Sequence, residues 1–285
     1  VQSELGCVSD EAIVQIAKSL GISRVDVEGV VTFYHFFSKN PGGKYSVYLN
    51  NSVTAQMNGR AAVAKAFSNA AGCAFGKTTG DGVIGLFDTS CIGMNDQEPA
   101  AIINGVVFTK LTADRAKTIV ADMKAGRAVQ DMVQEYGDGA NQSALIKAMV
   151  SNNIQRRGPV LFAPFEAGSA IKAAVEKKPE DVIEEIKISN LRGRGGAGFP
   201  TGMKWDFCRK AEGKKHYVVC NADEGEPGTF KDRVILTEIP QMLFEGMAVG
   251  GYAVGAEEGI LYLRAEYMYL KKYLEDVLEK MRKNK

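Results

Sequence analysis

Cysteine is scarce and scattered in this sequence. The five cysteines are Cys7, Cys73, Cys91, Cys208 and Cys220. No two of them are spaced like the paired ligands of an iron–sulfur cluster, and an odd, scattered set argues against a disulfide framework. Nothing near Val1 has the pattern of a signal peptide. We therefore expect a cytoplasmic protein without a metal site of its own in this chain.

An excess of one charge and long apolar runs are also missing. The 35 basic and 34 acidic side chains leave a formal net charge of +1, which gives no electrostatic reason to expect nucleic acid. The most apolar window, 239–254, is interrupted by Pro240, Glu245 and three glycines. No run reaches the roughly 18 residues that span a bilayer. We expect neither nucleic-acid binding nor membrane insertion.

The first forty residues predict two short helices and an aromatic run. Residues 10–20 (DEAIVQIAKSL) form an amphipathic pattern that ends at Gly21, and Ser23 is a candidate cap for a second helix from Arg24. The run at 30–37 (VVTFYHFF) follows. We interpret it as a helix end packed into a core, with a ligand contact as the alternative.

From residue 44 the pattern changes to strands alternating with helices. We predict strands at 44–49 and 83–87, an alanine-rich helix at 59–71, a hairpin at 100–108 that turns at Asn104-Gly105, and a helix at 113–125 capped by Thr112. This order is that of a small thioredoxin-like α/β sandwich.

Three motifs in this part resemble the thioredoxin-like 2Fe–2S subunit of respiratory complex I. They are 27–34 (VEGVVTFY), 78–82 (TTGDG) and 91–95 (CIGMN) followed by Pro99. Members of that family hold their cluster with two cysteine pairs, and the matching positions in this sequence are Asn50, Ala55, Cys91 and Asn95. Since Asn and Ala do not replace thiolates, we predict that this domain carries no 2Fe–2S cluster. Cys91 is then interpreted as a small buried hydrophobic residue.

A glycine-rich stretch at 191–205 (LRGRGGAGFPTGMKW) is the most distinctive part of the sequence. It holds five glycines between Gly193 and Gly202, so its backbone amides can approach an anion closely. The glycine spacing fits the dinucleotide fingerprint, but that fingerprint requires a strand before it and a helix after it. Here 179–189 (PEDVIEEIKIS) predicts a preceding helix, and a strand at 216–220 lies after the loop. We therefore predict a phosphate-binding loop of another kind, entered from a helix.

An acidic turn, 221–228 (NADEGEPG), follows the strand at 216–220. We predict that this strand and a second one at 259–264 are buried and parallel, with a glycine-containing helix at 240–254 ended by Gly255 and an amphipathic helix at 267–282. Ligands of open parallel sheets lie beyond the carboxyl ends of the strands, where this turn falls. The loop's amides and cations suit phosphate, whereas the turn suits sugar hydroxyls, an amide or a ribityl chain. The alternative is that the acidic residues form only a solvated turn.

Both motifs resemble the NADH-binding flavoprotein subunit of complex I, from about Ile171 to the end. Carried over by position, the residues that would hold FMN are Gly193, Arg194, Gly195, Gly196, Lys204, Asn221, Asp223 and Glu224. The residues that would meet the nicotinamide nucleotide are Phe199, Phe207 and Glu226. The resemblance implies hydride exchange between two stacked rings, which requires no acid–base residue, so we predict no catalytic side chain.

The presence of both modules in one chain resembles the diaphorase flavoproteins of soluble NAD-reducing nickel–iron hydrogenases. The motifs 33–37 (FYHFF), 86–89 (LFDT) and 96–99 (DQEP) strengthen this resemblance. It implies NAD(H) as substrate and, as partners, other diaphorase and hydrogenase subunits that carry iron–sulfur clusters. Two alternatives remain: the fused diaphorase subunit of an NAD-dependent formate dehydrogenase, and a docking scaffold without catalysis.

The predicted organisation is α/β in four segments. They are a helical segment (1–38), a thioredoxin-like domain without its cluster (39–126), a helical linker (127–170) and the N-terminal part of a Rossmann-like FMN- and NADH-binding domain (171–285). In the resembling family a second flavin-contacting stretch and a cysteine-rich 4Fe–4S domain follow. We expect a 4Fe–4S cluster only in that further part, and we expect this chain alone to be inactive.

Overall fold

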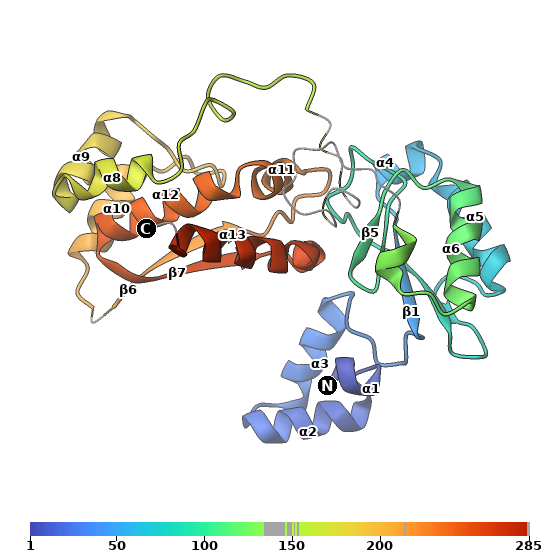
Figure 1. The fold of residues 1–285 in the computed structure, drawn as a ribbon. Coiled ribbons are helices and arrows are strands. Elements are labelled where there is room, and N and C mark those ends of the chain that lie inside the picture. The colour runs from blue at the N-terminus through green and yellow to red at the C-terminus, as the bar shows by residue number, and fades with distance from the viewer. Residues whose placement is uncertain (134–145, 147–149, 151, 153, 214, 284–285) are drawn as a thin grey trace. The chain divides into compact units, whose positions relative to one another are not determined.

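The computed structural model describes residues 1–133, 146, 150, 152, 154–213 and 215–283. The chain divides into two compact units, Val1–Ser151 with Glu226–Phe230 and Asn152–Gly225 with Lys231–Lys285. Each unit is described by itself (Figure 1). Of the predicted helical linker (127–170), residues 134–145, 147–149, 151 and 153 lie outside the described residues. Its described part contains the short 3-10 helix η1 (Val129–Met132), and residues 154–168 are not helical.

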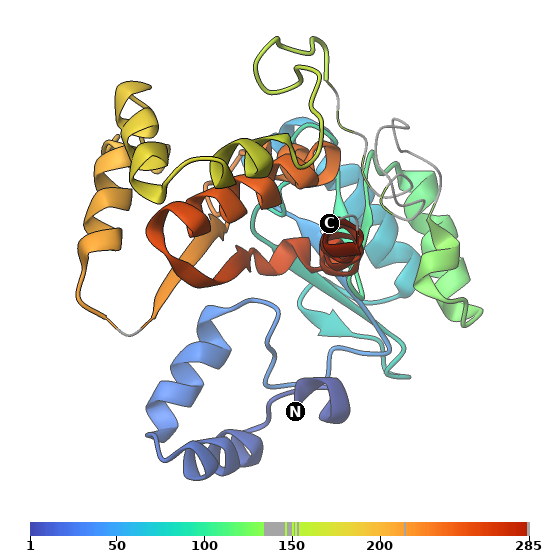
Figure 2. The same cartoon turned by 60° about the vertical axis from the view of Figure 1, so that its left-hand side comes forward.

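The N-terminal part of the first unit contains the helices α1 (Gln2–Leu5), α2 (Asp10–Leu20) and α3 (Arg24–Phe33). Of these, α2 and α3 begin where the sequence predicts, and α1 was not predicted. Ser9 caps α2, and Ser23 forms a capping box with Asp26 at the start of α3. Figure 2 shows these helices grouped together. A small core joins α2 and α3 and is formed by Val8, Ala12, Ile13, Ala17, Val27 and Val31.

The aromatic run after α3 is less buried than predicted. Phe33 is 79% exposed, and Tyr34 and Phe37 are 47% and 42% exposed. The prediction of a packed helix end is therefore wrong for these three rings, because α3 directs Val27 and Val31 into its core and leaves Phe33 outside. The Tyr34 ring instead contacts Phe33 and Phe37 edge to face, with Phe33 and Tyr34 centroids 5.0 Å apart.

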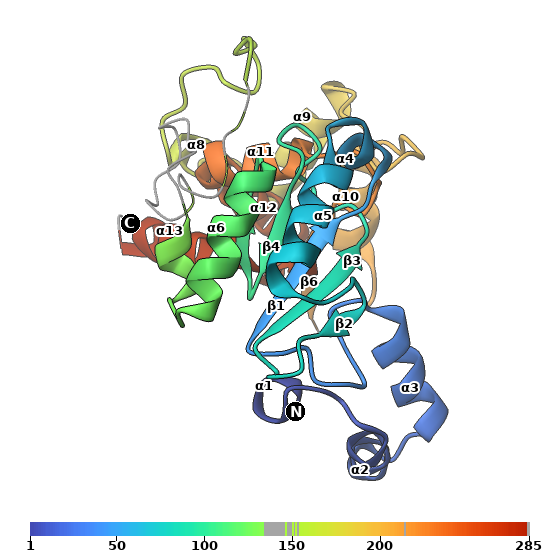
Figure 3. The same cartoon turned by 90° about the vertical axis from the view of Figure 1, so that its right-hand side faces the viewer.

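A five-stranded sheet forms the centre of the first unit, in the order β2-β3-β1-β4-β5. The strands are β1 (Tyr45–Asn50), β2 (Lys77–Thr78), β3 (Ile84–Thr89), β4 (Ala101–Ile103) and β5 (Val106–Phe108). β1 and β3 are parallel, and the other pairs are antiparallel. The helices are α4 (Val53–Met57), α5 (Arg60–Ala71) and α6 (Ala113–Lys124), and Figure 3 shows α5 and α6 side by side in front of the sheet. This confirms the thioredoxin-like order, with β2 added.

The second unit contains two parallel strands, β6 (His216–Ala222) and β7 (Ala256–Leu263). Its helices are α8 (Ser169–Val175), α9 (Pro179–Ile188), α10 (Thr201–Lys210), α11 (Lys231–Glu238), α12 (Pro240–Val254), the 3-10 helix η2 (Ala265–Leu270) and α13 (Lys271–Lys283). α12 and α13 lie on the same side of the strands in Figure 1. The predicted helix at 267–282 thus starts as a 3-10 turn. In the described residues, none of the helices has both the length and the apolar character needed to cross a membrane.

The strands of this unit are not buried on both faces as predicted. Alternate side chains remain exposed, with Tyr217 at 48%, Val219 at 60%, Ile260 at 42% and Tyr262 at 56%. The continuous apolar pattern predicted two covered faces. Among the described residues the helices cover one face, and the alternation along each strand leaves the other face exposed.

Close helix packing depends on two glycines. A Cβ on Gly202 of α10 would lie 2.6 Å from the amide nitrogen of Lys187 in α9, and one on Gly250 of α12 would lie 3.2 Å from Trp205 in α10. Gly250 thus lets α12 approach α10 closely. Gly246 of the same helix meets nothing within 4 Å.

Candidate functional site

The glycine-rich loop is a narrow turn between α9 and α10. Arg192 and Pro200 form an antiparallel bridge, and the Gly193 amide donates to the Phe199 carbonyl at 2.9 Å. The tip therefore consists of residues 194–198. Helix α10 begins directly after the loop, whereas we predicted the strand at 216–220 as the next element; the loop thus lies at a helix N-terminus.

The backbone of the loop requires glycine and is open to a ligand. Gly196 and Gly198 have φ of 106° and 61°, a region that L side chains rarely adopt. A Cβ at Gly195, Gly196 or Gly198 would meet nothing within 4 Å. The open side of these amides, next to the positive end of a helix, fits a phosphate group.

Two cations beside the loop are available to an anion. Arg194 and Lys204 are exposed, and within the part of the chain that the structure describes neither has an ion-pair partner. Arg192 instead donates to the Gly198 carbonyl at 3.0 Å and so shapes the loop. The donor set therefore fits the phosphate of a nucleotide-type cofactor.

The two predicted stacking residues lie together. Phe199 in the loop and Phe207 on α10 have ring centroids 6.4 Å apart, tilted by 48°. They are 43% and 56% exposed. An exposed aromatic pair can contact the flat face of a ring.

The acidic turn after β6 is ordered by its own hydrogen bonds. Asn221 and Asp223 are exposed, and the Asn221 side chain accepts from the Asp223 amide at 3.0 Å. Glu224 is 2% exposed, and its carboxylate accepts from the hydroxyl of Tyr267 at 2.8 Å. Arg264 donates to the carbonyl of Glu224. Sequence reasoning missed Tyr267 and Arg264 because neither belongs to a motif.

The structure brings some of the predicted site residues together and not others. Among the described residues, no hydrogen bond or ion pair joins the glycine loop to the turn at 221–225. Glu226 is exposed and belongs to the segment Glu226–Phe230, which groups with the first unit. The cofactor-binding roles of all eleven residues stay predictions.

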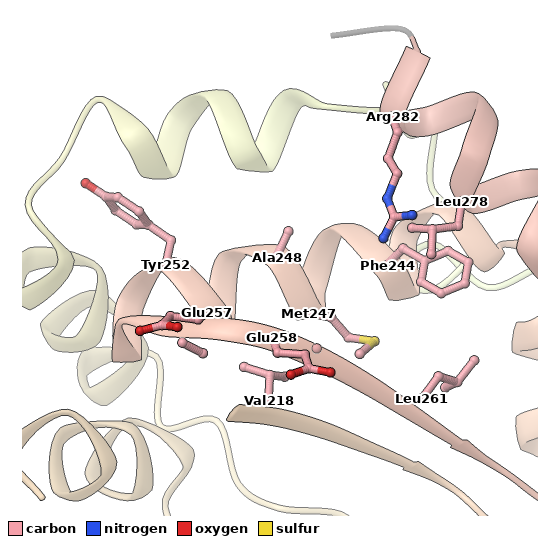
Figure 4. A pocket seen from close by; sticks show the side chains of 13 residues that line it. Val218, Phe244, Met247, Ala248, Tyr252, Glu257, Glu258, Leu261, Leu278 and Arg282 are labelled. Carbon is pink, nitrogen blue, oxygen red and sulfur yellow. The ribbon is translucent and has the colours of Figure 1, made fainter. Parts of the chain in front are cut away.

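A cavity of about 290 Å³ lies elsewhere in the second unit, between α12, β7 and α13. Figure 4 shows Arg282 extending from α13 beside Leu278 and Phe244, with Glu257 and Glu258 on the strand. None of the predicted site residues lines it. Its carboxylates would repel phosphate, so the glycine loop remains the candidate site.

In the first unit, the four positions compared with cluster ligands lie at or after the ends of β1 and β3. Asn50 ends β1, and Ala55 lies in α4. Cys91 is buried, and its sulfur accepts from the Asn95 side chain at 2.8 Å. The Thr54 hydroxyl donates to the side-chain oxygen (Oδ1) of Asn95.

The two units correspond to two known domain classes. Residues 1–124 match the family model of the thioredoxin-like 2Fe-2S ferredoxins, and residues 186–285 match that of the Nuo51 FMN-binding domain. The chain thus joins a thioredoxin-like domain to an FMN-binding domain of the kind found in complex I.

Over its whole length the chain is similar to the alpha subunit of an NAD-reducing hydrogenase. It is 47% identical over 285 residues to the NAD-reducing hydrogenase HoxS subunit alpha of Cupriavidus necator, covering 100% of this chain and 47% of that protein. A subunit of the NADH-quinone oxidoreductase of Rhizobium meliloti is 51% identical over 128 residues, 44% of this chain and 30% of that protein. The crystal structure of an NAD+-reducing NiFe-hydrogenase in the air-oxidized state matches with a TM-score of 0.83 and 34% identity, covering 96% of this chain and 47% of that one. The chain spans about half the length of the hydrogenase protein and less of the other relative.

The match of the first unit corrects one prediction. We predicted a thioredoxin-like domain without a 2Fe–2S cluster. This prediction is wrong, because the family that matches residues 1–124 is that of thioredoxin-like 2Fe-2S ferredoxins, which points to such a cluster. The residues of the chain do not supply its usual four thiolates: Cys91 is the cysteine among the four compared positions, and no group of three or more His, Cys, Asp or Glu among the described residues could hold a metal. We therefore derive no step through a cluster in this domain.

Proposed function

We propose that this chain is part of an NAD-dependent oxidoreductase and that its second unit binds FMN and NAD(H) for hydride transfer between them. The observation that carries the proposal is the glycine loop, whose open amides lie at the start of α10 beside the exposed cations Arg194 and Lys204. This loop falls within the region that matches the Nuo51 FMN-binding domain.

FMN, when bound, exchanges a hydride with nicotinamide and passes electrons on singly. The residues of this chain would bind FMN and the nicotinamide nucleotide and orient their rings. The amides of residues 194–196, with the side chains of Arg194 and Lys204, would hold the phosphate, while Gly193 closes the loop on Phe199. Asn221 and Asp223 would offer oxygens to the ribityl chain. Phe199 and Phe207 hold a flat ring, and Glu226 accepts from the ribose or carboxamide of the dinucleotide. Hydride transfer needs aligned rings and no side-chain proton, so these positions suffice.

The partners we propose are the iron–sulfur subunits of a hydrogenase, because the relative that matches the whole chain is a hydrogenase subunit. A formate dehydrogenase assembly would use the same flavin chemistry with another catalytic subunit. Metal analysis of the co-purified assembly separates the two, since nickel supports the hydrogenase and molybdenum or tungsten supports the formate dehydrogenase.

The experiment that tests the site removes each of the two loop cations in the full-length assembly. We expect Arg194→Ala and Lys204→Ala each to weaken FMN binding about tenfold, since each removes a charge-assisted contact to phosphate. Lys210→Ala is the matched control, because Lys210 is exposed on the same helix and pairs with Asp206 at 2.8 Å. Flavin fluorescence titration measures the affinities. Unchanged affinity in both variants would contradict the assignment of the loop.

A further inference from the structure

The turn that follows β6 is anchored from inside by one buried carboxylate. The Glu224 side chain is fully buried, and both of its oxygens accept from protein donors. One oxygen accepts from the amide of Asp232 at 2.9 Å and lies 3.5 Å from the Lys231 ammonium. The other accepts from the amide of Arg233 at 3.2 Å and from the Tyr267 hydroxyl at 2.8 Å. The carboxylate therefore faces the protein and the N-terminus of α11.

Two residues after the second strand complete this anchor. Arg264 directly follows β7; its guanidinium donates to the Glu224 carbonyl, and its amide donates to the Ala222 carbonyl at 3.3 Å. The same guanidinium lies 5.6 Å from the centroid of the Tyr267 ring. Arg264 and Tyr267 are 5% and 0% exposed. The carboxyl ends of β6 and β7 are thus tied together through Glu224.

Neighbouring side chains of the anchored turn point either into the protein or toward solvent. Glu224 is buried, whereas Asn221 and Asp223 are exposed and bonded to each other. Open parallel sheets bind ligands at this edge, so the backbone fixed by Glu224 determines where these exposed oxygens lie. Polar groups held in place before binding give affinity that mobile groups would lose to ordering.

We propose that Tyr267 and Arg264 are positioning residues of the flavin site, acting through Glu224 on the turn that presents Asn221 and Asp223. The inference rests on the proposed function, and it assigns Glu224 an internal role in place of direct contact with the cofactor. Burial raises the pKa of Tyr267, so its hydroxyl keeps its proton and donates at neutral pH.

The test uses Tyr267→Phe in the full-length assembled enzyme, which removes the hydroxyl and keeps the ring. We expect the dissociation constant of FMN to rise about tenfold, as for the loss of a hydrogen bond to a charged group. The KM for NADH, measured at saturating FMN, should stay unchanged. Arg264→Lys keeps the charge without the planar fork and should weaken FMN binding in the same direction. Tyr262→Phe is the control, because that side chain is 56% exposed on the neighbouring strand.

The outcomes separate this inference from the proposed function. Wild-type FMN affinity in folded Tyr267→Phe overturns the inference, even where the unfolding midpoint falls, because the network would then support the fold alone. Failure of both Tyr267→Phe and Arg264→Lys to assemble overturns it for the same reason. A wild-type assembly that binds no FMN overturns the proposed function itself.

Discussion

At the scale of single residues, Glu98 is a carboxyl group whose chemistry is altered by burial. It lies in the first unit, where it accepts from the Ala100 amide at 2.7 Å and from the Asn50 side chain. Burial is the largest influence and raises its pKa from 4.5 to about 7. Between these two pH values, the folded protein therefore holds a proton on this group that the unfolded chain has released.

We predict that this group makes the first unit less stable as pH rises from about 4.5 to about 7. In this range the folded state binds more protons than the unfolded state, so the free energy of unfolding falls, by about 3 kcal/mol in all. Glu98→Gln cannot titrate and should flatten this dependence. Urea unfolding of both proteins at pH 5 and pH 8 measures it, and equal slopes with pH would refute the prediction.

A second prediction at this scale concerns Glu226, an exposed carboxylate in the acidic turn. Glu226→Gln should raise the KM for NADH about tenfold through the loss of a charged acceptor, while the flavin content of the assembly stays the same. Steady-state kinetics with flavin quantification checks both quantities. Release of FMN from this variant would show that the turn has been assigned wrongly.

At the scale of elements, close helix packing in the second unit depends on glycines, which have no side chain at the helix contacts. Gly202→Ala places a Cβ 2.6 Å from the Lys187 backbone, and we predict that it destabilises the second unit by about 1–3 kcal/mol. Gly246→Ala is the matched change in α12, with nothing within 4 Å. It should stabilise by up to about 1 kcal/mol, because alanine favours a helix interior. Thermal unfolding of the two variants should therefore shift in opposite directions, and a shift in the same direction would contradict the packing role of Gly202.

Local sequence signals predicted most of the helices and strands. The features that the sequence did not predict depend on contacts between distant parts of the chain. Gly21, Ser23 and Gly255 mark helix ends in the sequence, and each cap has the expected geometry. Helix α10 was not predicted, because the glycines before it and Gly202 within it suggested irregular backbone, although Pro200 is typical of a helix start. Burial of β6 and β7 was wrong because it depends on what covers each face, which strand periodicity does not encode.

The candidate site, like the elements, was predictable where its signals are local. The glycine loop, its cations and the aromatic pair follow from composition and spacing. The structure places the loop at the start of α10, with Lys204 and Phe207 on that helix. The buried partners of Glu224 could not be found, because Tyr267 lies 43 residues further along the chain and only folding brings the two together.

At the scale of the whole molecule, the chain combines two domain classes that the comparisons support separately and together. The prediction about the 2Fe–2S cluster was wrong because it weighed four positions, whereas the family match covers residues 1–124. One face of the two-stranded sheet is exposed, and the chain spans about half the length of its hydrogenase relative. The full-length assembly is therefore the appropriate material for every flavin measurement.

The central claim is that the second unit holds FMN where NADH reduces it. Anaerobic addition of NADH to the full-length assembly, followed by visible absorption, tests this directly. We predict a flavin band that NADH bleaches, and we expect the double substitution Arg194→Ala with Lys204→Ala to diminish that band in proportion to the lost FMN. An assembly without flavin, or a bound flavin whose absorption NADH leaves unchanged, would contradict the claim.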